Sequence, residues 1–311
     1  MPTVAELTRE LRGRLPELSD VNGKPRHEFG EVFDLIERYD PCVAEDYERF
    51  FDWMKLVLDT RREPFRRLID TKITASHIDA MAHLTFVIGE EIARLLEARH
   101  ASPDYLSRLL DFLPEHKRLG VFSLNYDCCL EDACRAARID VTTGFNLKTN
   151  KWDPSLFGVR GKGINLYKLH GSLRWFGTRD ESLQDDQFQH NLVLMELRSE
   201  QRQQHPPHVK VASAPELVLG PADKLQPDDP FVTLFCEFHR SLRQSRMCVI
   251  IGYGYRDSHV NSALDHAFDA GVSVLDVNPN SPSGKYLSET RYHHLKMTAK
   301  GSLRNNWHKC S

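Results

Sequence analysis

Four polar segments of this sequence each follow a short apolar run, and their residue types suit acid–base chemistry. The first segment holds Asn125, the second holds His170, the third begins at Gly252 and the fourth holds Asn278. A histidine imidazole can take up a proton at neutral pH, and an asparagine amide both donates and accepts hydrogen bonds. Side chains of these two types can together position a water molecule and accept a proton from it.

Each polar segment stands at the end of a run that has the composition of a β-strand. These runs span residues 120–124, 165–169, 246–251 and 272–277. Helical patterns follow two of them, at residues 126–137 and 258–270. This alternation predicts an α/β fold with a Rossmann-like parallel sheet and helices on both faces. Ligands of such sheets bind at the carboxyl ends of the strands, so we expect the four polar segments to converge on one site.

Each polar residue also has a purely structural interpretation. Asn125 and Asp127 are of the types that cap helices and favour their N-termini. His170 is compatible with a buried core histidine, and the glycines of the third segment are compatible with simple turns. Asn278 begins an Asn-Pro pair, which is common in turns. The arrangement at successive strand ends is what favours a shared site over these separate interpretations.

The N-terminal third is predicted to form a helical module. Apolar residues recur at helical spacing over residues 4–15, 29–37, 45–58, 77–99 and 105–113. The longest of these helices either covers the sheet or offers an assembly surface. The polar stretch 184–208 is expected to be an exposed insertion or loop. We predict one domain over residues 1–285, with a mainly helical part at 1–115, a parallel-sheet part at 116–285 and a C-terminal tail at 286–311.

Composition excludes several classes of function. The net charge of the 311 residues is −3, so no global basic field predicts direct nucleic-acid binding. No apolar run approaches the roughly 20 residues that span a bilayer. The first residues lack the pattern of a signal peptide, which predicts a cytoplasmic protein. The seven cysteines include no CxxC pair, so we interpret them as buried thiols and expect no metal site.

Three stretches carry a resemblance to a known family. Residues 123–131 read Ser-Leu-Asn-Tyr-Asp-Cys-Cys-Leu-Glu and resemble a T-x-N-Y-D-x-x-x-E pattern. Residues 167–175 read Tyr-Lys-Leu-His-Gly-Ser-Leu-Arg-Trp and resemble a pattern containing K-L-H-G-S. Residues 250–261 resemble an I-G-Y-S-x-x-D-x-H-I-N pattern. Together these stretches resemble the SIR2-like domains of bacterial antiphage-defence proteins, which are related to sirtuins.

The resemblance implies a Rossmann-like domain that hydrolyses NAD to nicotinamide and ADP-ribose, as the effector of an abortive-infection system. It implies that Asn125 and His170 are the catalytic residues and that Asp127 lies near the nicotinamide amide. The other residues matched to substrate binding are Ser123, Gly171, Gly252, Tyr253, Asp257 and Asn278. Within that set, the resemblance places Gly252, Tyr253 and Asp257 beside the adenosine half and Asn278 beside its ribose.

Two departures from the family pattern bear on function. The chain lacks the four-cysteine zinc spacing of sirtuin deacylases, which favours a hydrolase over a deacylase. It also lacks a G-A-G-x-S loop, whose backbone N–H groups would hold the pyrophosphate, so we expect it to begin inside the domain. A non-catalytic module for NAD or ADP-ribose is therefore the alternative. The resemblance further implies self-assembly, or a partner such as a helicase-like ATPase or an Argonaute-type protein.

Overall fold

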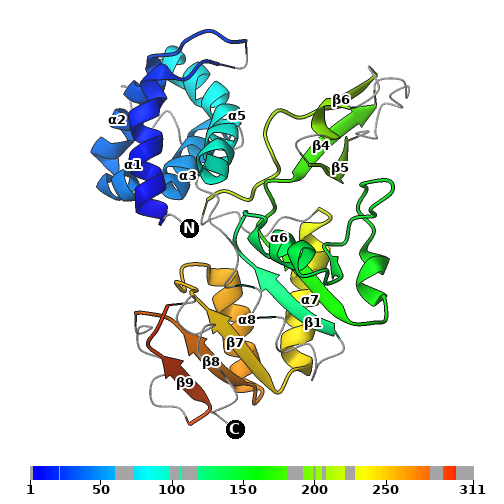
Figure 1. Ribbon diagram of the computed structural model, residues 1–311. Helices are drawn as coiled ribbons and strands as arrows, with labels where there is room; N and C mark the ends of the chain where they lie inside the picture. The colour runs from blue at the N-terminus through cyan, green and yellow to red at the C-terminus, as the bar shows by residue number, and fades with distance from the viewer. Residues whose placement is uncertain are drawn as a thin grey trace. The chain divides into compact units, whose positions relative to one another are not determined.

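The structure is a computed structural model that describes residues 3–20, 22–59, 73–98, 106, 109, 118–180, 192–198, 201–204, 208–220, 228–280 and 290–298. The chain forms two compact units, and each is built from two separate stretches of sequence. Unit 1 contains Met1–His100 and Gly171–Lys224, and unit 2 contains Ala101–His170 and Leu225–Ser311. Figure 1 labels the elements of both units.

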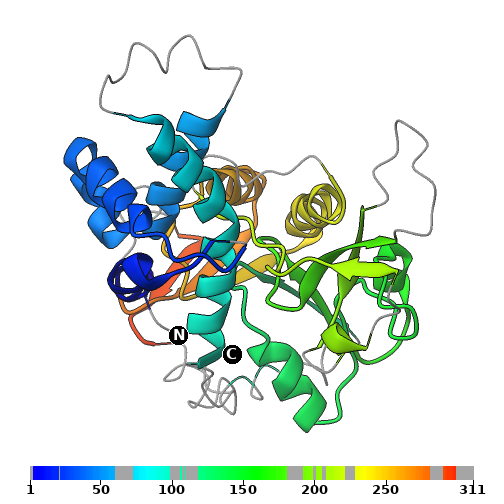
Figure 2. The same cartoon turned by 90° about the horizontal axis from the view of Figure 1, so that it is seen from above.

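Unit 1 begins with the predicted helices. They are α1 (Val4–Arg14), α2 (Glu28–Tyr39), α3 (Tyr47–Leu58) and α5 (Ala75–Ala98), with short 3-10 helices at Leu15–Glu17 and Pro41–Glu45. Side-chain caps fix two of the starts, since Thr3 and Glu6 form a capping box and Asp46 accepts from the first backbone N–H groups of α3. The apolar faces meet in a core that includes Phe33 and Phe50, and the four helices pack as a bundle (Figure 2).

The second stretch of unit 1 forms an antiparallel sheet. Its strands are β4 (Trp175–Asp180), β5 (Leu192–Glu196) and β6 (Val209–Val211), in the order β5-β4-β6. A short 3-10 helix, η6, covers Gln201–Gln203. The exposed insertion or loop expected over 184–208 therefore contains a strand, because a four-residue apolar run within this polar stretch, followed by Glu196, pairs along β4. Pairing supplies the backbone hydrogen bonds that the local composition does not predict.

Unit 2 begins with a parallel sheet of order β1-β3-β2. Its strands are β1 (Arg118–Ser123), β2 (Val141–Thr142) and β3 (Gly163–Lys168), and the 3-10 helix η5 (Pro154–Gly158) precedes β3. Side chains alternate across a strand, so Ile164 and Leu166 share one face. There they pack with Cys134 of α6 (Cys129–Ala136). On the other face Tyr167 stacks on Phe122, which in turn contacts Phe238 of α7 (Phe231–Gln244).

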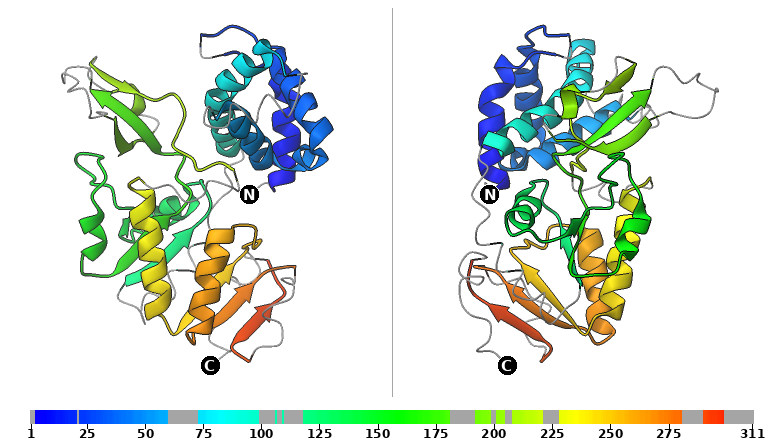
Figure 3. Two further views of the ribbon diagram at one scale, coloured as in Figure 1. Left: turned by 180° about the vertical axis from the view of Figure 1, so that it is seen from behind. Right: turned by 45° about the vertical axis from the view of Figure 1, so that its right-hand side comes forward.

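A second parallel sheet of order β7-β8-β9 completes unit 2. Its strands are β7 (Met247–Ile251), β8 (Ser273–Val277) and β9 (Tyr292–Leu295), with α8 (Ser258–Asp269) between β7 and β8. Helices α7 and α8 lie side by side over the sheets (Figure 3). Where one continuous sheet was expected, the described strands form two, because no described strand bonds the remaining edge of β1 or of β7. The α/β class with parallel strands and helices on both faces is confirmed.

Several boundaries differ from the predictions. Helix α6 begins at Cys129 rather than at residue 126, and neither α7 nor β9 was predicted. Strand β9 falls in the segment expected to be a tail and pairs in parallel with β8. The helix expected at 105–113 lies almost wholly outside the described residues. No described helix combines the length and apolar character needed to cross a bilayer.

Candidate functional site

Asn125 and His170 leave the sheet side by side. Strands β1 and β3 are parallel neighbours, and Ser123 lies opposite Lys168 in their register. Asn125 and His170 each follow two residues later, and the backbone N–H of Leu169 donates to the carbonyl of Ser123 at 2.9 Å. The two residues predicted to be catalytic therefore stand beyond the carboxyl ends of adjacent strands, where ligands of parallel sheets bind.

His170 is held by a buried carboxylate at the start of α8. Its Nε2 lies 2.8 Å from Oδ2 of Asp257, and the two residues are 5% and 3% exposed. An ionised carboxylate only accepts hydrogen bonds, so this contact requires the proton on Nε2 and leaves Nδ1 of the neutral ring as an acceptor. A carboxylate that fixes the tautomer and orientation of a histidine in this way prepares it to act as a base.

The same carboxylate also caps the N-terminus of a helix. Oδ1 of Asp257 accepts from the backbone N–H groups of His259 and Val260, at 2.9 and 3.0 Å, and so caps α8. The family resemblance implied that Asp257 borders the adenosine half of NAD. In the structure both of its carboxylate oxygens are engaged within the protein, one with His170 and one with α8.

The segment between β7 and α8 is fixed by its own side chains. The Tyr253 hydroxyl lies 3.0 Å from the carbonyl of Asp257 and 2.9 Å from Oδ1 of Asn261, and it accepts from the N–H of Asp257 at 3.2 Å. Asn278 donates through Nδ2 to the carbonyl of Tyr253 at 2.7 Å. Burial raises the pKa of Tyr253 well above that of a free tyrosine. These contacts give Tyr253 and Asn278 a role in holding the segment that carries Asp257.

Gly252 begins that segment in a conformation that suits glycine. Its φ is +68°, in the left-handed region, and its N–H donates to the carbonyl of Val277 at 2.9 Å. A Cβ placed on Gly252 would meet no atom within 4 Å, so its backbone faces open space. Open backbone at the end of β7 is what a ligand at the carboxyl edge of the sheet needs.

The buried carboxylate of Asp276 forms a hydrogen-bonded cluster with two tyrosines, one of which, Tyr255, belongs to the same segment. Oδ2 of Asp276 accepts from the hydroxyls of Tyr255 and Tyr292, at 2.9 and 2.6 Å. Asp276 is 0% exposed, and its Oδ1 has no hydrogen-bond partner among the described residues. Burial, with the neighbouring carboxylate, raises the pKa of both tyrosines. Tyr255 has a φ of +55°, and its carbonyl accepts from Nδ2 of Asn261 at 2.9 Å.

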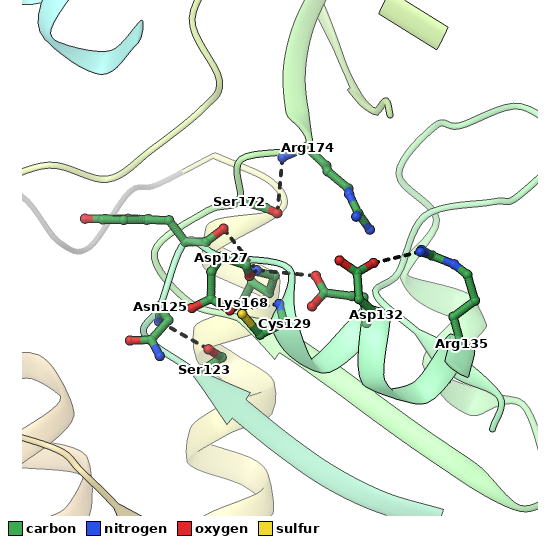
Figure 4. A network of polar contacts seen from close by, with 11 residues as sticks. Ser123, Asn125, Asp127, Cys129, Asp132, Arg135, Lys168, Ser172 and Arg174 are labelled. Atoms are coloured by element: carbon green, nitrogen blue, oxygen red, sulfur yellow. Dashed lines mark hydrogen bonds and ion pairs between the residues drawn. The ribbon is translucent and has the colours of Figure 1, made fainter. Parts of the chain in front are cut away.

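Asn125 is the exposed member of the pair predicted to be catalytic. Its backbone N–H donates to Oγ of Ser123 at 3.2 Å, and its side chain makes no hydrogen bond within the described part of the chain (Figure 4). The alternative that Asn125 caps the following helix was wrong, because the N-cap of α6 is Cys128. Asp127 does serve that helix start, since its Oδ1 accepts from the N–H of Cys129 at 2.8 Å.

Gly171 is explained by close packing of the backbone in unit 1. Its φ is +91°, and it forms an isolated bridge with Leu217. A Cβ there would lie 2.2 Å from the carbonyl oxygen of Glu216 and would overlap it. Glycine is therefore required by the fold next to His170, whether or not a ligand approaches it.

Four further residues, for which the sequence predicted no role, support the site. They are Lys168, Glu131, Tyr255 and Asp276. Lys168 and Glu131 form a buried ion pair below the Asn125 segment, and the other two form the tyrosine-carboxylate cluster. A lysine that ends an apolar strand is a signal that could have been noticed, because such a charge needs a partner. Asp276 lies inside an apolar run in the same way.

The described cysteines differ in burial, and Cys248 is intermediate. Cys128, Cys129 and Cys134 are buried, as interpreted from the sequence, whereas Cys42 and Cys236 are exposed. Burial raises the pKa of Cys129 to about 12, with the nearby Asp127 carboxylate adding to the effect. Within the described ranges, no group of three or more His, Cys, Asp or Glu side chains could hold a metal ion.

Comparison with known proteins identifies the family. Residues 120–280, just over half of the chain, match the model of the SIR2-like domain. The chain therefore belongs to the SIR2-like domain family. No curated protein sequence matches it.

Solved sirtuin structures are also similar to the chain. One Sir2 enzyme, studied for mechanism and regulation, is 11% identical, with a TM-score of 0.44 over 82% of this chain and 93% of that one. Another, bound to an acetylated peptide, is 11% identical, with a TM-score of 0.42 over 80% and 87%. A mutant Sir2 homologue in complex with ADP-ribose is 16% identical, with a TM-score of 0.40 over 70% and 73%.

Proposed function

We propose that this protein hydrolyses the bond between nicotinamide and ribose in NAD, and so releases nicotinamide and ADP-ribose. The proposal depends chiefly on the buried contact between His170 and Asp257, which lies beyond the same sheet edge as Asn125. Membership of the SIR2-like domain family supports NAD as the substrate.

The reaction needs a positioned water molecule more than it needs an acid. Nicotinamide leaves as a neutral molecule and the ribose passes through an oxocarbenium-like state, so the protein must orient the ribose and exclude other nucleophiles. The Asn125 amide can hold the attacking water, since it donates and accepts and is exposed. His170, oriented by Asp257, can accept the proton that this water or a ribose hydroxyl loses.

The remaining predicted residues fit supporting roles. We propose that the Asp127 carboxylate, half-buried beside the Asn125 segment, accepts a hydrogen bond from the nicotinamide carboxamide. The open backbone at Gly252 provides room for the adenosine half of the substrate. Ser123, Tyr253 and Asn278 act by holding the two segments that carry these groups, through the hydrogen bonds described above.

The experiment incubates the purified chain with NAD and measures nicotinamide and ADP-ribose by chromatography. Wild type should release both in equal amounts, and His170→Ala should release neither at a measurable rate, because the proton acceptor is gone. Asn125→Ala should lower kcat by about 100-fold with KM changed far less. Equal turnover by wild type and His170→Ala would overturn the assignment. Binding of ADP-ribose without turnover would instead support a non-catalytic module, and turnover that requires an acetylated peptide would support a deacylase.

We also propose the biological setting implied by the family resemblance, a cytoplasmic effector of antiphage defence that a partner or self-assembly activates. An uncontrolled NAD hydrolase would be toxic, so activity should rise on infection. Cellular NAD should fall after phage infection in cells that express wild type and should stay constant with His170→Ala. A constant NAD level in both strains, from a protein that is active in vitro, would contradict the defence role alone.

A further inference from the structure

Lys168 is a buried cation whose side chain contacts the segment that carries Asn125. It is the last residue of β3, its side chain is 1% exposed, and its Nζ donates to the carbonyls of Tyr126, at 3.2 Å, and Asp127. The third contact is with Oε1 of Glu131, at 3.3 Å. An ammonium has three hydrogens to donate, so every donor of Lys168 has an acceptor. Figure 4 shows Lys168 next to Asn125, Asp127 and Cys129.

Glu131 makes this cation possible. It stands in the first turn of α6 and is only 4% exposed. Burial alone lowers the pKa of Lys168, but Glu131, Cys128 and Asp127 together outweigh burial and leave that pKa raised. The ammonium therefore keeps its charge inside the protein. A buried ion pair rarely stabilises a protein more than apolar residues of similar size would. A role in positioning the backbone therefore explains this pair better than a gain in stability.

The two carbonyls belong to the residues that immediately follow Asn125. That short stretch lies between the end of β1 and the start of α6, outside regular secondary structure. Its contacts include those with Lys168, the hydrogen bond from the Asn125 N–H to Ser123, the bond from the Cys129 N–H to Asp127, and the bond from the Asp132 N–H to the carbonyl of Cys128. Lys168 thus connects, by hydrogen bonds, the backbone on the C-terminal side of Asn125 to the end of β3, two residues before His170.

We infer that Lys168, paired with Glu131, is a positioning residue that fixes the backbone conformation from which Asn125 reaches the substrate. The inference depends on the proposed NAD hydrolysis. It adds Lys168 and Glu131 to the site as residues that act by holding the backbone next to Asn125. The ammonium is 1% exposed and donates its three hydrogens within the protein, so we assign it a positioning role rather than a catalytic one. Loss of the ammonium should therefore lower kcat and loosen the backbone of residues 124–128, with little effect on the affinity for NAD.

The test compares one double variant with a matched control. Lys168→Met leaves Glu131 buried without its cation, so the double variant Lys168→Met with Glu131→Met replaces both partners by apolar side chains that can stay folded. The control is Arg135→Met, which removes the exposed ion pair of Arg135 with Asp132 on the same helix. For each protein, the measurements are the Tm, hydrogen exchange of amides 124–128 without ligand, and kcat and KM for NAD.

The double variant should keep a cooperative thermal transition but exchange amides 124–128 about tenfold faster or more, because the two carbonyls lose their anchor. Its kcat should fall by about 10- to 100-fold while KM changes by less than about threefold. Arg135→Met should match wild type in all three measurements. A folded double variant with wild-type exchange and wild-type kcat would overturn the inference, as would a lowered Tm with no change in either.

The two proposals fail in different ways. If wild type releases no nicotinamide, the proposed function is wrong, and the exchange measurement still tests whether Lys168 orders the segment. If wild type is active and only the double variant is unchanged, the positioning role alone is wrong.

Discussion

Asp257 contacts His170 through one carboxylate oxygen and caps helix α8 through the other, although 87 residues separate it from the histidine in sequence. One buried side chain thus fixes both the orientation of an imidazole after β3 and the start of a helix after β7. The helix cap and the histidine contact should respond differently to substitution of Asp257. A helix cap needs only a hydrogen-bond acceptor, whereas the histidine contact also depends on the charge of the carboxylate.

Asp257→Asn should separate the helix cap from the histidine contact. Asparagine caps helices about as well as aspartate, so the Tm should stay close to that of wild type. The amide cannot hold an imidazolium as a carboxylate does, and it favours the wrong tautomer when its NH₂ group faces Nε2. We expect kcat for NAD hydrolysis to fall by about 100-fold or more. Asp257→Ala should lose the same activity and about 1 kcal/mol of stability as well. Wild-type turnover in Asp257→Asn would contradict the orienting role.

Gly171→Ala should destabilise the protein by more than a surface substitution does. A residue other than glycine at a φ of +91° costs about 1–3 kcal/mol, and the added Cβ would also overlap the carbonyl of Glu216. Gly158→Ala is the matched control, because a Cβ there meets nothing within 4 Å. Denaturant unfolding should show a large drop in the free energy of unfolding for the first variant and almost none for the second. Equal midpoints would show that the close approach is absent in solution.

The buried thiols should resist alkylation in the folded protein. Burial raises the pKa of Cys129 to about 12 and that of Cys134 to about 11, so almost no thiolate exists at pH 8. Exposed Cys42 and Cys236 should react with iodoacetamide within minutes under the same conditions. Mass spectrometry of digested protein distinguishes the sites, and denatured protein provides the positive control. Rapid native labelling of Cys129 would mean that the start of α6 opens readily.

Stability should decline in alkaline solution partly through the tyrosine cluster. Burial raises the pKa of Tyr255 and Tyr292 in the folded state, so folding favours their protonated forms. Their contribution to stability is therefore complete below the ordinary tyrosine pKa of about 10 and is lost as pH rises above that value.

The measurement is the free energy of unfolding from pH 8 to pH 11.5, with absorbance at 295 nm reporting phenolate. Tyr255→Phe removes one of the titrating groups, so its stability should fall less steeply with pH than that of wild type. It should also be less stable at pH 8, because Asp276 loses a hydrogen-bond donor. Identical pH slopes for the two proteins would show that Tyr255 ionises as freely in the folded state as in the unfolded one.

The site could be predicted from sequence as far as local patterns determine it. Asn125 and His170 were found because each follows a short apolar run, and the register of β1 with β3 confirms that these runs end together. The role of Asp257 could not be found in this way, because its contact with His170 depends on how two separate sheets pack within unit 2. Lys168 could have been noticed as a charge that ends an apolar strand, but its link to the Asn125 segment could not, because the two acceptors there are backbone carbonyls, which leave no trace in residue types.

The fold shows a similar division. Helices with a clear apolar face, such as α2 and α8, were placed nearly to the residue. Strands β5 and β9 were missed, because each is four or five residues long and depends on pairing with another strand for its backbone hydrogen bonds. Helix α7 was missed although Phe231, Leu234, Phe238 and Leu242 bury one side of it at helical spacing, and that pattern was available in the sequence.

The interleaved order of the two units has a consequence for synthesis on the ribosome. Each unit needs a stretch of chain that is made after part of the other unit, since unit 1 closes with Gly171–Lys224 and unit 2 closes with Leu225–Ser311. The contact between His170 and Asp257 cannot form until α8 has emerged, so His170 of a nascent chain lacks its carboxylate partner until then. The proposed NAD hydrolysis therefore cannot begin before translation has passed α8.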